Sequence, residues 1–253
     1  MIKFFRHIRK SLLTQGKTGK YFKYAIGEII LVVIGILIAL QINNWNENRK
    51  LNEQRKELIS NLITDFTDTN ETLVSAIEKR ENELNTMNTF YKIIENETQT
   101  ISVDSLRKIA TVFFMEDNFK PTISSYNEAV SNGDFRLLKS RSLTQYIDRF
   151  FESADSYSNT FNFGGENFFN GSAWELRKSL GSLQPIVVSR SNFDAMPYKK
   201  LLYSEYISKV NEPLTTATFE NSYVIKKNLA GNLKQMKTSC DSIIATLKKL
   251  DND

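Results

Sequence analysis

The side chains from which hydrolytic and zinc sites are usually built are nearly absent from this sequence. Its 253 residues include one cysteine, Cys240, and one histidine, His7. A single cysteine excludes an intramolecular disulfide. A histidine confined to the first residues leaves the rest of the chain without a Ser-His-Asp site, a Cys-His site or histidine ligands for zinc. Carboxylate or lysine chemistry has no supporting motif, so we expect no catalytic, cofactor-binding or metal-binding residues and predict that the chain is not an enzyme.

Proline and glycine are also scarce, with 4 and 10 residues in the whole chain. Neither occurs between Trp45 and Pro121, so we expect the helix of the apolar run before Trp45 to continue without a break into the first helix of the bundle. One stretch, Ile186-Val187-Val188, resembles a strand but is too short to build a sheet. The composition therefore predicts an all-α protein.

Acidic residues are missing from residues 1–24, which carry seven lysines and arginines. Subtracting these seven from the totals of 33 basic and 29 acidic residues leaves 26 basic against 29 acidic residues. A nearly neutral body argues against a nucleic-acid-binding surface. Apolar residues recur at helical spacing within the arm, so we predict a basic amphipathic helix that lies on the anionic inner leaflet of a membrane. A disordered basic tail is the alternative.

The longest apolar run, AIGEIILVVIGILIALQI at residues 25–42, contains one charged residue, Glu28. A helix needs about 20 largely apolar residues to cross a bilayer, so this run predicts a transmembrane helix. The basic arm before it favours a cytoplasmic N-terminus, with residues 43–253 on the other side. A cleaved signal peptide is the competing interpretation, but the triplet Ala39-Leu40-Gln41 offers no small-x-small cleavage site.

Aromatic residues flank the apolar run on both sides, where the membrane meets water. We expect Tyr21 and Tyr24 to anchor the inner interface and Trp45 the outer one. The predicted organisation is therefore a cytoplasmic arm at 1–24, a transmembrane helix at 25–42 and a helical bundle at 43–253.

Three residues of the run fall on one face of the predicted helix, namely Glu28, Gly35 and Ala39. Small residues let transmembrane helices approach closely, and a carboxylate can form a hydrogen bond across the contact. We predict a helix contact face here, which would serve a homo-oligomer or a membrane-protein partner. For Glu28, the alternatives are an interfacial position paired with Lys20 or Lys23, and an ion path.

Two stretches repeat apolar residues every three or four positions, the spacing of a heptad seam. The first runs from Ile63 to Ile94, with Asn70 and Arg80 at its polar steps. The second runs from Leu229 to Leu250. We predict two long antiparallel helices that form two walls of the bundle. Cys240 lies on the second seam, so we expect a small buried hydrophobe and not a reactive thiol.

Shorter helices are expected between the two seams, over 105–114, 122–131 and 143–161, with further ones around Trp174 and Tyr206. Sequence signals for helix ends are Gly133 and the pair Gly164-Gly165. The start of the last helix is indicated by Asn211 as its cap and Pro213 in its first turn. Two side-chain groups complete the expectations. Asp65, Asp68, Glu71 and Glu78 are interpreted as a solvated helix face. Phe161, Phe163, Phe168, Phe169 and Trp174 are interpreted as a hydrophobic cap over the core, with an aromatic ligand cleft as the alternative.

Two blocks of sequence are more specific than a generic apolar run and helix. They are YAIGEIILVVIGILIALQINNWNENR at residues 24–49 and PTISSYNEAVSNGDFRLLKSRSLTQYI at residues 121–147. Both resemble a large uncharacterised family of membrane-anchored proteins from Bacteroidetes, which is known only as a domain of unknown function. The resemblance implies placement in the bacterial inner membrane with a periplasmic helical domain. It brings no catalytic residues.

These observations favour a non-enzymatic interaction or scaffold module held at the membrane. The alternative is an envelope sensor or ligand-binding bundle. A 24-residue arm is too short for a catalytic output domain, so such a sensor would have to signal through a membrane partner.

Overall fold

A computed structural model describes residues 18–96, 101–114, 117–180 and 201–252 of the chain. The secondary structure of these residues is helical, without a strand, which confirms the all-α prediction. The Ile186-Val187-Val188 stretch and most of the basic arm lie outside the described residues. The chain divides into two compact units, Met1–Glu57 and Leu58–Asp253. The predicted borders at residues 24 and 42 are not tested by this division and stay predictions.

The first unit contains the beginning of helix α2 (Thr18–Ile94). Its large apolar side chains from Ile26 to Ile42 are 47–63% exposed, and none of this stretch is buried. A helix that is apolar on every side is stable only in an apolar surrounding. Within the described residues, α2 is long and apolar enough to cross a membrane.

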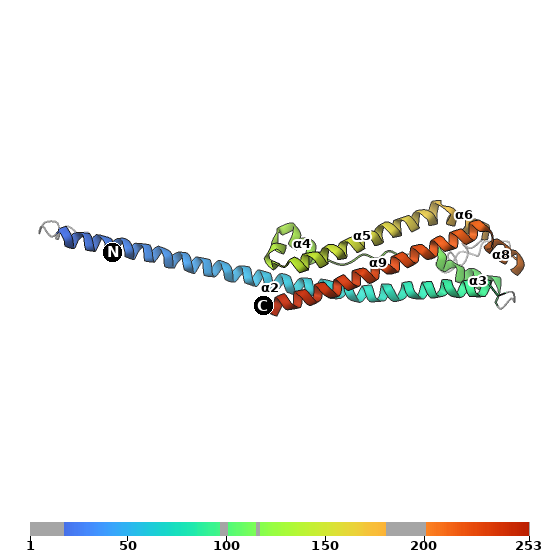
Figure 1. Cartoon of the computed structure of the whole chain (residues 1–253), viewed down its shortest axis with the longest axis horizontal. Helices are drawn as coiled ribbons and strands as arrows, with labels where there is room; N and C mark the ends of the chain where they lie inside the picture. Colours follow the sequence, from blue (N-terminus) through green and yellow to red (C-terminus); the bar gives the residue numbers. More distant parts are fainter. Residues whose placement is uncertain (1–17, 97–100, 115–116, 181–200, 253) are drawn as a thin grey trace, which may run out of the picture. The chain divides into compact units, whose positions relative to one another are not determined.

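The second unit is built on three long helices, shown in Figure 1. They are the part of α2 from Leu58 onward, α5 (Arg141–Asn170) and α9 (Pro213–Asn252). On α2 and α9, the Sγ of Cys240 donates to the carbonyl of Phe66 at 3.1 Å, and the Phe90 and Phe219 rings lie 5.4 Å apart. Contacts thus pair rising numbers on α2 with falling numbers on α9, so the two helices run antiparallel.

Shorter helices cover the two ends of this unit. They are α3 (Val103–Ala110), η1 (Thr111–Phe113), α4 (Ser124–Asn132), η2 (Asp134–Leu138), α6 (Ser172–Leu180) and α8 (Tyr203–Val210). In Figure 1, α4 lies at the end where α9 finishes, whereas α3, α6 and α8 lie at the end where α2 finishes.

The apolar core of the second unit forms two clusters. The first joins the α2 residues from Ile59 to Leu73 with α5 and the C-terminal part of α9. The second joins Met87 and Phe90 with α3, η1, α6, α8 and Phe219. The predicted seam of α9 is buried from Leu229 to Leu247, and Leu250 packs against it partly buried. Burying an apolar side chain at each of these positions contributes roughly 1.5–3 kcal/mol of stability, which holds the helices together.

Helix ends follow the sequence signals in part. Gly133 ends α4 with φ of 77°, a left-handed conformation that glycine adopts without steric cost, as predicted. Pro213 begins α9, also as predicted. The expectation that Asn211 caps the start of α9 was wrong: its N–H donates to the carbonyl of Ile207 at 3.0 Å and closes α8 instead. An N-cap directly precedes the first helical residue, and Glu212 occupies that position before Pro213, so Asn211 is too far from α9 to cap it.

The prediction that Gly164-Gly165 ends a helix was wrong. α5 continues through both glycines to Asn170, and its C-cap is Gly171. Gly164 is buried, and the apolar residues on both sides of the pair, such as Tyr157 and Phe168, pack into the two core clusters. Each interior glycine costs about 1 kcal/mol relative to alanine, which tertiary packing of this size outweighs.

One of the four predicted solvated acidic residues has a structural role. An Asp65 carboxylate oxygen accepts the N–H of Ser125 at 2.7 Å and so caps α4 from outside that helix. Nearby, the Thr69 hydroxyl donates to the carbonyl of Thr122 at 2.8 Å. The other three, Asp68, Glu71 and Glu78, are exposed as expected.

Candidate functional site

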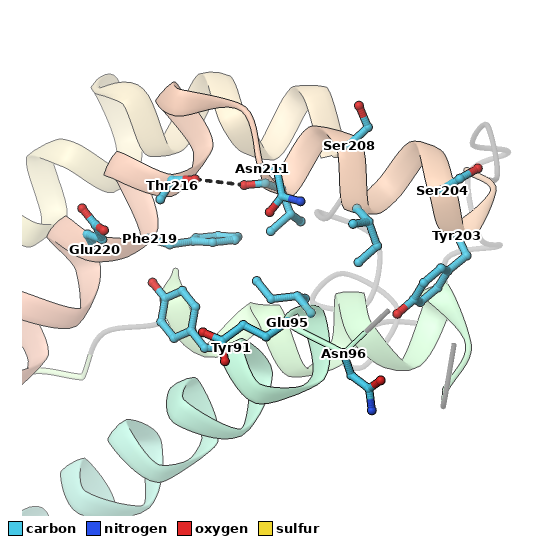
Figure 2. A pocket seen from close by; sticks show the side chains of 13 residues that line it. Tyr91, Glu95, Asn96, Tyr203, Ser204, Ser208, Asn211, Thr216, Phe219 and Glu220 are labelled. Atoms are coloured by element: carbon cyan, nitrogen blue, oxygen red, sulfur yellow. Dashed lines mark hydrogen bonds between the residues drawn. The ribbon is translucent and has the colours of Figure 1, made fainter. Parts of the chain in front are cut away.

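A groove of about 870 Å³ opens at the end of the second unit where α2 finishes (Figure 2). Its volume is in the range of small-molecule sites. Three helices supply its walls: the last residues of α2, most of α8 and the first turns of α9. The lining residues are Tyr91, Ile94, Glu95, Asn96, Tyr203, Ser204, Ile207, Ser208, Val210, Asn211, Thr216, Phe219 and Glu220.

The apolar floor of the groove is held in place by the second core cluster. Phe219 is fully buried, stacks on Phe113 at 4.3 Å and meets Phe90 edge-on at 5.4 Å. The turn between α8 and α9 is fixed by a hydrogen bond from the Thr216 hydroxyl to the carbonyl of Val210 at 3.3 Å, drawn in Figure 2. The groove is therefore part of the folded core and not a crease between loose loops.

Two tyrosine hydroxyls distinguish this groove from an ordinary surface depression. The hydroxyl oxygens of Tyr91 and Tyr203 are buried, and neither has a hydrogen-bond partner in the described part of the chain. Burial, with Glu220 and Tyr223 nearby, raises the pKa of Tyr91 to about 12, so this phenol is neutral at pH 7. A buried hydroxyl without a partner costs about 1–3 kcal/mol. These two atoms would therefore gain most from polar groups of a bound molecule.

The ionisable groups of the groove are acidic. Glu95 follows the last turn of α2, and Glu220 lies on α9; both are exposed. Neither lysine, arginine nor histidine occurs among its described lining residues. In Figure 2, Tyr91 on α2 and Glu220 on α9 lie on facing sides of the opening.

This arrangement is suited to binding. The lining serines Ser204 and Ser208 have no histidine beside them to act as a base in the described groove. Among the described residues, no group of three or more histidine, cysteine or acidic side chains could hold a metal ion.

A buried ionic cluster lies between the two core clusters of the second unit. One carboxylate oxygen of Glu83 contacts Arg80 Nη1 at 2.6 Å and Lys226 Nζ at 3.3 Å. Arg80 Nη2 also donates to the carbonyl of Asp117 at 2.5 Å, and the Tyr157 hydroxyl donates to the same carbonyl at 2.9 Å. The cluster thereby ties α2, α5, α9 and the segment before α4 together.

Sequence reasoning noticed Arg80 only as a polar step in an apolar seam and missed Lys226 altogether. Their side chains are 3% and 0% exposed, and that of Glu83 is 14% exposed. The signal available in the sequence was the spacing of Arg80 and Glu83, three residues apart on one helix, which allows an ion pair. The partner from α9 becomes visible only once the two helices are paired.

Cys240 is buried, as predicted. Its thiol donates to the carbonyl of Phe66, and burial with the neighbouring Asp241 raises its pKa to about 12. A thiol that stays protonated and inaccessible is not a nucleophile. The site is structural.

The predicted contact face of the apolar run lies in the first unit. Gly35 and Ala39 are exposed and Glu28 is partly buried. No heavy atom lies within 4 Å of the position that a Cβ on Gly35 would take. The role of this face in helix contacts stays a prediction. Of the predicted interface anchors, Trp45 is 66% exposed with the Arg49 guanidinium 5.9 Å from its ring centre. The side chains of Tyr21 and Tyr24 lie outside the described residues.

The aromatic residues near the end of α5 do not gather into one cap. Phe161 packs against the first core cluster and Phe168 against the second, whereas Phe163 and Phe169 are 57% and 65% exposed. None of them lines the groove. Its aromatic residues come from α2, α8 and α9, and only the folded chain brings them together.

Comparison with family models relates most of the chain to a known family. The model of a family of unknown function, DUF6090, matches residues 28–193, about two thirds of the chain. The match includes most of the apolar run and the Pro121–Ile147 block. No curated protein and no solved structure matches the chain.

Proposed function

This chain belongs to the DUF6090 family of unknown function, and on that premise we propose that it is a single-pass membrane protein whose helical bundle acts as a non-enzymatic interaction module. The observation that carries the proposal is the apolar part of α2, whose large side chains are exposed on every side from Ile26 to Ile42. Such a surface is stable in a bilayer and unstable in water.

The proposed placement is the inner membrane of a bacterium, with the N-terminal arm on the anionic cytoplasmic leaflet and residues 43–253 in the periplasm. The seven basic residues before the apolar run support this orientation. The distribution of histidine supports a non-enzymatic role, because His7 lies in the proposed cytoplasmic arm and leaves the bundle without this residue.

Topology can be tested with single cysteines, because native Cys240 is buried and supplies a silent background. Asn82→Cys, at an exposed position of α2, should react with a membrane-impermeant maleimide in cells whose outer membrane has been permeabilised. Lys10→Cys should react only after the inner membrane is broken. The unaltered chain should remain unlabelled in both preparations. Labelling of Lys10→Cys before lysis would refute the orientation.

The interaction role is proposed to involve the face of Glu28, Gly35 and Ala39, through self-association or a membrane-protein partner. Purification from mild detergent followed by mass measurement of the complex should show a species larger than one chain. Gly35→Leu should reduce it, because leucine prevents close approach of two helices. Gly27→Leu is the matched control, since it lies about 80° around the helix from Gly35. A lone monomer in the unaltered protein would remove the scaffold proposal.

A second candidate is supported by the groove. A ligand-binding bundle that signals through a membrane partner would need a preformed site in the bundle, and the groove in Figure 2 is such a site. Ligand binding that changes the mass or composition of the purified complex would favour this candidate over a static scaffold.

A further inference from the structure

We propose that the groove between α2, α8 and α9 binds a small organic ammonium ion attached to an apolar body. The proposal rests on the groove alone and holds whether or not α2 crosses a membrane. It is carried by three properties of the groove: the sign of its charges, the state of its hydroxyl groups and its apolar floor.

The charges favour a cation. Glu95 and Glu220 are the ionisable acidic groups of the lining, and its described residues offer no basic side chain to neutralise them. Helix α2 ends at the groove with its carbonyl pole, whereas α9 begins there. Helix α8 lies along the groove from Tyr203 to Asn211 and brings both of its poles to it. The amide pole of α9 is weakened because its first residue, Pro213, has no N–H. The sign of the charge in the groove is therefore set by its two carboxylates and is negative.

The hydroxyl groups give the ligand something to bind besides charge. Tyr91 and Tyr203 present buried phenol oxygens without hydrogen-bond partners among the described residues. Neutral phenol oxygens accept hydrogen bonds from an ammonium group, and the two carboxylates balance its charge. An anion could accept from the same hydroxyls but would then lie beside Glu95 and Glu220, where repulsion opposes it.

The floor favours an attached apolar group. Phe219, held rigidly by its ring contacts, lies beside Ile94, Ile207 and Val210. These side chains remove an apolar group of the ligand from water. Inorganic cations would gain nothing from this floor.

Three probes that share a ring and differ in charge test the proposal: benzylammonium, benzyl alcohol and benzoate. Binding is measured by titration calorimetry on the full chain in zwitterionic nanodiscs, with empty nanodiscs subtracted. Benzylammonium should bind with a dissociation constant of roughly 1 mM, as expected for so small a ligand. Benzyl alcohol should bind about tenfold more weakly, and benzoate should show no saturable binding.

Two variants locate the site. Glu220→Gln keeps the shape of an exposed side chain and should weaken benzylammonium about fivefold. Tyr91→Phe removes one hydroxyl and should weaken it about threefold. The matched controls, Glu78→Gln on α2 and Tyr146→Phe on α5, lie outside the groove and should leave binding unchanged. The proposal would be overturned if benzylammonium showed no saturable binding, or if it bound no more tightly than benzoate or benzyl alcohol. An affinity for benzylammonium that is unchanged in Glu220→Gln would also overturn it.

Discussion

Two stretches of the same helix, α2, differ in which side chains they expose: one exposes apolar side chains, and the other encloses charged ones. From Ile26 to Ile42, large apolar side chains are about half exposed, and the stretch contains one acidic residue. At Arg80 and Glu83, charged side chains are nearly enclosed, and Lys226 of α9 is fully enclosed with them. Exposure along α2 thus follows what surrounds each stretch, and residue polarity alone does not predict it. The difference is energetic, so it can be tested by moving charges.

The largest expected effect comes from removing the buried counter-charge. Glu83→Gln leaves Arg80 and Lys226 without their shared carboxylate, and the loss of one partner of a buried ion pair costs about 3–5 kcal/mol. Denaturant unfolding of the full chain measures it. Glu81→Gln is the control, because Glu81 pairs with Lys234 at 2.7 Å on the surface, where a pair contributes about 0–1 kcal/mol. Equal losses of unfolding free energy in the two variants would mean that the buried cluster contributes no more than a surface ion pair.

A charge placed on the exposed apolar stretch should be nearly as unfavourable as the removal of a charge from the enclosed cluster, but its effect should appear in membrane insertion. Val33→Arg is expected to disfavour membrane insertion by about 2.5–3.5 kcal/mol. Fractionation and alkali extraction would show the variant shifting from the membrane to the soluble or aggregated fraction. Val74→Arg, at a valine 38% exposed in the bundle, should change stability by less than about 0.5 kcal/mol. Membrane association that is unchanged by Val33→Arg would contradict the proposal that this stretch spans a bilayer.

The buried, neutral thiol of Cys240 should make the stability of the bundle depend on pH. The ordinary pKa of cysteine is 9.0, and burial raises that of Cys240 to about 12. Below pH 9 both folded and unfolded chains keep the proton, so stability is unaffected. Between pH 9 and 12 only the unfolded chain loses it, so stability falls as pH rises, by up to about 1.4 kcal/mol per pH unit. The unfolding free energy of Cys240→Ala should be less steep in this window, although lower overall. Parallel curves would contradict the assignment.

The smallest expected effect concerns the backbone of the bundle. Gly165 lies within α5, and no heavy atom lies within 4 Å of a Cβ placed there. Gly165→Ala should therefore stabilise the chain by about 0.5–1 kcal/mol. Gly133→Ala should destabilise it by about 1 kcal/mol, because the φ of 77° at Gly133 is strained for alanine. Thermal unfolding of the two variants should shift in opposite directions, and shifts of the same sign would contradict this account of α5.

Much of the fold could be predicted because helical periodicity marks buried faces. The seam from Leu229 to Leu247 is buried as its spacing indicates, and the one from Ile63 to Ile94 marks the correct face of α2. Periodicity does not say which polar residue on that face stays inside. Arg80 is enclosed because Lys226 and Glu83 meet it from two helices, a condition set by tertiary pairing.

Local signals failed where packing or a neighbouring helix overrode them. Gly164-Gly165 resembles a helix stop, yet the contacts of α5 on both sides of the pair carry the helix through. Asp65 resembles a solvated residue but caps α4, 60 positions later in the sequence. The groove was beyond reach for the same reason, since Tyr91, Tyr203 and Phe219 come from three helices that converge only in the folded unit.

The ionic cluster also determines the alignment of α2 against α9. Heptad-patterned faces fit together almost equally well after a shift of seven residues, because apolar side chains again meet apolar side chains. Such a shift would place Lys226 opposite Ala76 or Phe90 in place of Glu83, and would enclose an ammonium group with no carboxylate. The unpaired charge thus disfavours the shifted alignments, while the apolar seams hold the helices together. Arg80, Glu83 and Lys226 therefore favour a single register of α2 against α9.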